Sequence, residues 1–157
     1  MNRNLLIIVS WLLLSFQACD KTRVFDENKE IANEQWYYKN HLLFDVNIED
    51  TSRLYNIYVN LRVSNDYKYC NLFMMVLQIN PDKQLQKERK EFTLADENGR
   101  WLGKGLGDMY DYQIPVYKNT RFYEKGIYRF ELEQNMRNDT LLYIKSAGIR
   151  IEEVVSE

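Results

Sequence analysis

Alternation of apolar and polar residues is the feature that most limits the fold of this chain. In the segment LYNIYVNLRVS, apolar side chains occupy every second position from Tyr55 to Val63, and side chains such as Asn60 lie between them. Successive side chains of a β-strand point to opposite faces, so this period predicts a strand with one face in the core and one in water. Residues 42–48 (LLFDVNI) and 126–134 (GIYRFELEQ) share the period. We expect core positions for the alternating aromatic residues Tyr55, Tyr128 and Phe130.

Other segments indicate their place in a sheet. Residues 71–79 (NLFMMVLQI) are apolar on both faces, which predicts a central strand covered on each side. Pro115 cannot donate a hydrogen bond to a neighbouring strand, so residues 112–118 are expected at a sheet edge. Residues 82–91 (DKQLQKERKE) fit either a short helix or a charged edge strand.

Two local signals mark irregular backbone. Asn98-Gly99 lies between two strand-like segments and is typical of a type I′ hairpin turn, whose two central residues have positive φ. Gly148 lies inside the last predicted strand, where we expect a bulge.

About eight short strands joined by turns predict an all-β fold, an antiparallel β-sandwich. We expect a jelly-roll order of strands rather than an immunoglobulin-like one. The length of 157 residues is that of one domain, which we assign to residues 34–157.

The N-terminus predicts export and lipidation. A short start with one positive charge precedes ten consecutive residues that are nearly all apolar. This run is too short to span a bilayer, which takes about 20 residues, and it is typical of a signal peptide, here residues 1–18. Ala18 directly before Cys19 resembles a lipobox, in which the thiol receives a diacylglycerol and the new amino group an acyl chain. The alternative is an ordinary secretory signal. We expect a lipidated Cys19 and a polar tether over residues 19–33.

The charge and the second cysteine limit the partners. The chain has 21 Lys and Arg against 23 Asp and Glu, a net charge of −2, and no basic stripe, so we expect no nucleic-acid partner. Cys70 has no disulfide partner once Cys19 is lipidated. It begins an apolar run, which predicts a small buried hydrophobic side chain.

The segment GRWLGKGLGDMYD (99–111) holds four of the six glycines. A dinucleotide fingerprint would need a third glycine where Asp108 stands and a helix after it, and the segment has neither. A P-loop pattern is missing too. We therefore expect no phosphate ligand and no cofactor, and interpret these glycines as places of sharp turning or close approach.

The sequence offers little for catalysis or metal binding. His41 is the single histidine and begins a predicted strand without a nucleophile signature, so it is expected at the surface. One histidine and one free cysteine do not complete a zinc site. Asp108 and Asp111 are interpreted as solvated turn carboxylates rather than calcium ligands. We expect no enzyme activity, no metal and no small-molecule substrate.

Three residues are candidates for contact with a partner: Tyr58, Trp101 and Asp108. Tyr58 lies on the polar face of its strand, and Trp101 and Asp108 lie in the glycine-rich segment. Exposed aromatic side chains on β-sandwiches can stack on sugars, so a carbohydrate-binding module is an alternative.

A lipobox cysteine, Trp36 and several segments occur here in one order: FDVNIEDTSRLYNIYVNLR, NLF, GRWLGKGLGD, GIYRFELEQNMRNDTL and SAGIRIE. In these segments the chain resembles the gliding-motility lipoprotein GldH family of Bacteroidota over essentially the whole mature sequence. The resemblance implies a lipoprotein that gliding over surfaces requires, together with other Gld proteins and machinery that overlaps with type IX secretion. It implies no catalytic activity and no cofactor, and Cys19 is its one functional residue.

Two hypotheses follow. The first is a non-catalytic scaffold in the cell envelope, held by its lipid to a membrane and bound to other motility or secretion proteins. It predicts an exposed apolar patch or a free strand edge. The second is a module that binds glycan or peptidoglycan, which predicts Tyr58 and Trp101 exposed on one concave face. We favour the outer membrane, with the domain facing the periplasm, although Asp20 after the lipidated cysteine does not discriminate between membranes.

Overall fold

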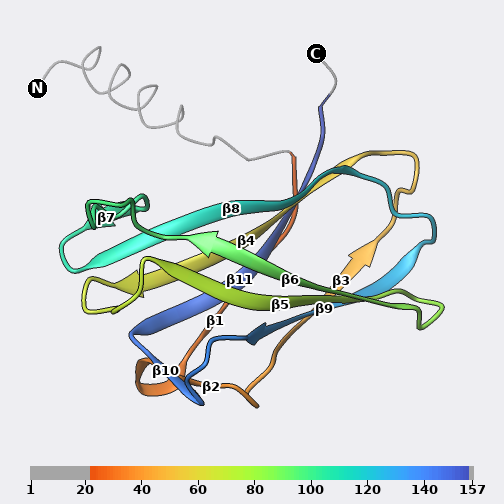
Figure 1. Cartoon of the computed structure of the whole chain (residues 1–157). Helices are drawn as coiled ribbons and strands as arrows, with labels where there is room; N and C mark the ends of the chain where they lie inside the picture. The colour runs from red at the N-terminus through yellow and green to blue at the C-terminus, as the bar shows by residue number, and fades with distance from the viewer. Residues whose placement is uncertain (1–21, 156–157) are drawn as a thin grey trace, which may run out of the picture.

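The computed structural model describes residues 22–155, and within this range the chain forms eleven strands and one 3-10 turn (Figure 1). The elements are β1 Arg23–Glu30, η1 Ala32–Glu34, β2 Gln35–Tyr37, β3 Leu42–Ile48, β4 Tyr55–Ser64, β5 Asn71–Ile79, β6 Leu85–Thr93, β7 Lys104–Leu106, β8 Met109–Thr120, β9 Gly126–Gln134, β10 Thr140–Leu142 and β11 Ile144–Glu153. Residues 1–21, which include the predicted signal peptide and Cys19, and residues 156–157 lie outside the described residues.

Two antiparallel sheets face each other and form a sandwich (Figure 1). One has the order β1-β11-β4-β8-β7 and the other β3-β9-β5-β6. When the eight long strands are numbered along the chain, the sheets read 1-8-3-6 and 2-7-4-5, which is the order of a jelly roll. The all-β sandwich and its jelly-roll order are therefore confirmed. The strand count is higher than the eight expected, because β2, β7 and β10 add three-residue strands; β2 and β10 pair as a ribbon at one end.

The core lies between the two sheets and is made by the alternating residues of their strands. In β4 the buried and partly exposed positions alternate from Tyr55 onward, as its sequence period predicts. Tyr55, Tyr128 and Phe130 are at most 3% exposed, which confirms their core positions. Trp36 of the short ribbon closes one end of the core, and its Nε1 donates to the carbonyl oxygen of Asn40 at 2.8 Å.

The N-terminal boundary of the fold needs correction. Residues 19–33 were expected as a polar tether, but Arg23–Glu30 form β1, which pairs with β11 along its length. Because β1 is an edge strand and its residues are exposed or half-buried, it carries no apolar alternation that would reveal it. The folded domain thus begins about ten residues before the predicted boundary at residue 34.

Strand positions in the sheets largely follow the sequence. β5 is central in its sheet, and the segment that fitted a helix or an edge strand contributes to β6, an edge strand. Pro115 lies in β8 beyond the short pairing with β7, at an open edge, as predicted. The prediction that β5 is covered on each side is wrong, because within residues 22–155 no second layer lies over its outer face. The Arg89 guanidinium lies 3.9 Å from the ring centroid of Phe73 and covers part of that face instead.

Two local predictions were wrong in detail. The hairpin at Asn98-Gly99 exists, but only Gly99 has positive φ (+77°), and Gly99 N–H donates to the Asp96 carbonyl. This is a type I turn followed by a left-handed glycine. The Asp96 carboxylate accepts the N–H groups of Asn98 and Arg100 and stabilises that form. The irregularity of β11 lies between Ile144 and Ser146 rather than at Gly148.

Candidate functional site

A groove of about 750 Å³ runs across the outer face of the five-stranded sheet. Two cross-strand rows of polar residues build it, because the alternation in β4 sends Asn60 and Arg62 away from the core. The first row is Asn28, Gly148, Asn60 and Gln113, and the second is Glu30, Ser146, Arg62 and Asp111.

Gly148 marks a close approach of two strands beside this groove. A side chain at this position would clash with Asn28 and with the carbonyl oxygen of Glu27 in β1. The Asn28 side chain itself occupies the space above Gly148, so the glycine allows β1 to lie close against β11. The glycine predicted to form a bulge is instead the place where β1 approaches β11 closely.

Polar pairs hold the sides of the groove. Arg62 lies 3.5 Å from the carboxylate of Asp111, and the Asn60 amide donates to Asp26 at 3.1 Å. Asp26 also accepts from Arg150 at 2.7 Å. The Oδ1 atom of Asn60 is buried and accepts no hydrogen bond from the described residues. A buried acceptor of this kind favours a donor such as water or a ligand hydroxyl at the groove.

The three candidate contact residues do not come together. Tyr58 pairs with Pro115 in β8, whereas Asp108 lies in the turn before Met109, the partner of Ser64. Six residues of β4 separate the two pairs, about 20 Å along a strand. Neither Tyr58 nor Trp101 lines the groove.

Each of these residues has a structural contact. Tyr58 is half-buried. Its burial, and to a smaller extent the negative charge of nearby Glu152, raises the pKa of its hydroxyl. Trp101 is half-buried and stacks on Tyr110, with ring centroids 5.3 Å apart. The Asp108 carbonyl accepts the N–H of Asn65 at 2.9 Å.

The glycine-rich segment serves the fold, as predicted. The rings of Tyr112 and Tyr110 lie directly against Gly103 and Gly105, and Gly107 turns the chain between β7 and β8 with φ of +71°.

The position of Cys70 contradicts its prediction. It is exposed rather than buried, because it lies in the loop before β5 and not in the apolar strand itself.

His41 lies at the surface directly before β3, as expected, but it has partners that the sequence analysis missed. β3 pairs with β9, and this pairing brings His41 next to Glu131 and Glu133. Both glutamates fall on the polar face of the alternating segment 126–134, a signal present in the sequence. Beside the single histidine, this group offers two carboxylates as metal ligands, so a zinc site here does not depend on cysteine.

The outer face of the four-stranded sheet carries apolar side chains. Ile127, Leu85 and Leu43 are 61%, 57% and 41% exposed. Ile79 of β5 pairs with Leu85 of β6 on one side and with Arg129 of β9 on the other. Ile127 lies two residues before Arg129 in β9 and is therefore a diagonal neighbour of Ile79. We call Ile79, Leu85 and Ile127 the apolar corner. In residues 22–155, no helix has the length and apolar character needed to cross a membrane.

Comparison with known proteins identifies the family. The sequence model of the GldH lipoprotein family matches residues 23–151, from the first strand to the last. The chain belongs to the GldH lipoprotein family. The start of the match at Arg23 agrees with the start of β1.

Two curated relatives support this assignment. A gliding motility lipoprotein GldH homolog of Christiangramia forsetii is 31% identical over 152 residues, covering 92% of this chain and 93% of the relative. The gliding motility lipoprotein GldH of Flavobacterium johnsoniae is 31% identical over 159 residues, covering 97% and 96%. Among solved structures, the VP2 subviral particle of infectious bursal disease virus aligns with a TM-score of 0.40 and 14% identity, over 85% of this chain and 33% of that chain.

Proposed function

We propose that this GldH-family protein is a non-catalytic scaffold of the gliding-motility apparatus, linked to the type IX secretion machinery. A lipid on Cys19 holds it to the outer membrane with the domain facing the periplasm, after removal of residues 1–18. The observation that carries the scaffold role is the apolar corner of the four-stranded sheet.

Large apolar side chains that are more than half exposed are unusual when they cluster, since water contact costs free energy in proportion to apolar area. Leu85 and Ile127 both exceed half exposure and lie on either side of Ile79. Phe73 and Met75 continue the apolar line along β5. A protein partner that covered this corner would gain from burying it.

The adjacent strand edge is protected against pairing. β6 is the edge strand here and carries Lys87, Lys90 and Arg89 among exposed neighbours. Charged edges of this kind disfavour addition of another strand. We therefore place the contact on the face of the sheet rather than on its edge.

Site-specific photocrosslinking in gliding cells tests the contact. A photoreactive phenylalanine analogue at Leu85 or Ile127 should crosslink to a motility or secretion protein of the envelope. The same analogue at Gln113, exposed on the other sheet, is the matched control. Crosslinking from Gln113 alone, or from no position, would contradict the proposal.

The anchor is tested separately. Cys19→Ser should leave the protein without lipid mass and release it from the membrane fraction. Membrane retention of this variant would contradict the anchor, and recovery of the wild type with the inner-membrane fraction would contradict its placement.

The groove favours one second candidate, a glycan-binding module. Asn60 lines a polar groove that could receive sugar hydroxyls, and its buried Oδ1 lacks a donor among the described residues. Against it, Tyr58 and Trp101 supply no stacking platform there. Retention of the wild type on insoluble peptidoglycan, lost in Asn60→Ala, would favour this function over the scaffold.

A further inference from the structure

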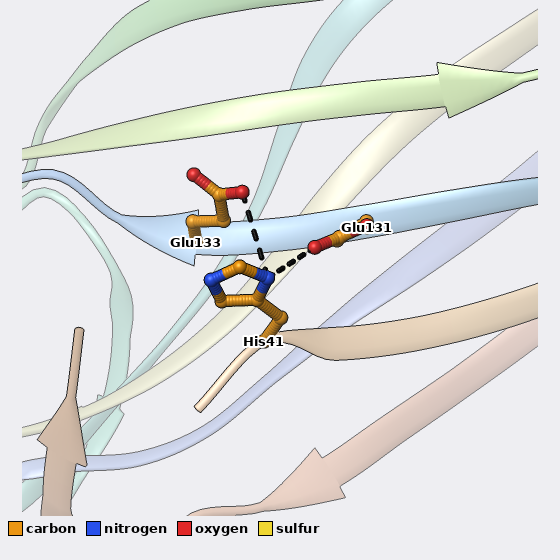
Figure 2. Close-up of side chains that lie close together, drawn as sticks. All are labelled: His41, Glu131 and Glu133. Carbon is orange, nitrogen blue, oxygen red and sulfur yellow. Dashed lines mark hydrogen bonds and ion pairs between the residues drawn. The ribbon is translucent and has the colours of Figure 1, made fainter. Parts of the chain in front are cut away.

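One imidazole and two carboxylates meet at the outer surface of the four-stranded sheet (Figure 2). Glu131 and Glu133 are two residues apart in β9, so both side chains emerge on the same face. Nδ1 of His41 contacts Oε1 of Glu131 and lies 3.6 Å from Oε1 of Glu133. One nitrogen and two oxygens thus lie within 4.8 Å of one another.

The two carboxylates are poorly exposed for surface glutamates. The side chains of Glu131 and Glu133 are 14% and 16% exposed. Two negative charges repel each other, and more strongly where water is excluded. Lys87 balances part of this charge at 3.3 Å from Glu133. Arg129, the next charged residue on this face of β9, donates two hydrogen bonds to Asp45, and its charge also attracts Glu131. A cation between the glutamates would stabilise both.

We infer that His41, Glu131 and Glu133 form a binding site for a divalent transition-metal cation, with zinc the best fit. Zinc takes imidazole nitrogen and carboxylate oxygen at about 2.0–2.2 Å, and a tetrahedral arrangement then places ligand atoms about 3.3 Å apart. The 3.6 Å separation of His41 and Glu133 is close to this value. The contact between His41 and Glu131 opens to admit the ion.

The ligand set discriminates between metals. Magnesium and calcium prefer sites made of oxygen alone, so the imidazole disfavours them. Three protein ligands leave a fourth zinc position for water or for a donor group from another molecule. His41 is 40% exposed, which leaves this position reachable from solvent.

Because His41 is the single histidine of the chain, its imidazole gives an unambiguous signal. The experiment uses the full lipoprotein in detergent micelles, with 15N-labelled histidine, no histidine tag and Cys70→Ser to remove the exposed thiol. The protein is first stripped with chelator and then titrated with zinc chloride. We expect binding of about one zinc per chain, with a shift of the imidazole resonances that saturates at that ratio.

The variants assign the ligands. His41→Ala and Glu131→Gln should each weaken zinc binding at least tenfold, whereas Glu91→Gln, an exposed carboxylate on the same sheet face, should leave it unchanged. Zinc binding without a change at the imidazole, equal binding by His41→Ala, or no saturable binding would each overturn the site. Wild-type imidazole shifts alone decide the question if a variant fails to fold. The result is independent of the crosslinking at the apolar corner, so either proposal can fail alone.

Discussion

Gly105 of β7 lies against the ring of Tyr110 so closely that an added Cβ would come within 2.5 Å of it. The ring cannot easily move away, because its other neighbour is Trp101, stacked at a centroid distance of 5.3 Å. Gly105→Val should therefore lower the free energy of unfolding by about 1–3 kcal/mol, the usual cost of overpacking.

Urea denaturation followed by tryptophan fluorescence measures this effect. Lys104→Val, at the neighbouring exposed position, is the matched control and should change stability little. A Gly105→Val protein of wild-type stability that lost a crosslinked partner would show instead that the hairpin is a contact site.

Gly148 makes a second steric prediction. Gly148→Ala would place a methyl group against Asn28 and the backbone of Glu27, so β1 would have to separate from β11. Hydrogen exchange should accelerate at the amides of β1 while the β4–β8 pairing keeps its protection. Ser146→Ala, two residues away on the same face, is the control. Unchanged exchange in Gly148→Ala would contradict the close approach.

Tyr112 makes stability depend on alkaline pH. Burial raises the pKa of its hydroxyl to about 12, against about 10 in an unfolded chain. The folded state therefore holds this proton more tightly, and the stability it contributes is present below pH 10 and is lost as pH rises from 10 towards 12.

The variant Tyr112→Phe isolates this effect. At pH 8 it should be less stable than the wild type by about 1 kcal/mol, because the hydroxyl donates to the Leu94 carbonyl at 2.7 Å. Unfolding free energies measured at pH 8, 10 and 11 should show this difference shrinking with pH. A constant difference would contradict the raised pKa.

The exposed Cys70 predicts a reactive thiol in the folded protein. Native lipoprotein should react with one equivalent of a thiol reagent such as DTNB, and Cys70→Ser with none if Cys19 carries the lipid. Reaction only after denaturation would contradict the exposure of Cys70. A remaining equivalent in Cys70→Ser would contradict lipidation.

Strands with one buried face were predictable, and strands without one were not. β3, β4 and β9 alternate because one face of each strand lies on the core and the other faces away from it, so the period is visible in the chain. β1 contributes to the fold through its backbone pairing with β11 rather than through buried side chains. Its sequence therefore resembles that of a tether. β2 and β10, with three residues each, are too short to show any period.

The candidate sites show the same limit. That Glu131 and Glu133 share a face follows from the strand period alone. That His41 joins them depends on β3 lying beside β9, a jelly-roll pairing between residues 90 positions apart. Counting histidine and cysteine could not find this group. Cys70 was misplaced for a related reason, because the strand begins one residue after it.

The early start of β1 bears on how the molecule is held. With the proposed lipid on Cys19, two residues, Asp20 and Lys21, lie between the membrane attachment and Thr22, whose carbonyl accepts the N–H of Glu153 at 2.8 Å. The three residue-to-residue steps from Cys19 to Thr22 span at most about 11 Å. The linker between the proposed lipid anchor and the domain is thus short. It would restrict both the distance of the domain from the bilayer and the directions in which its faces can point. In the proposed anchored state, a partner would approach a domain that lies close to the lipid surface, with the paired ends of β1 and β11 towards the membrane.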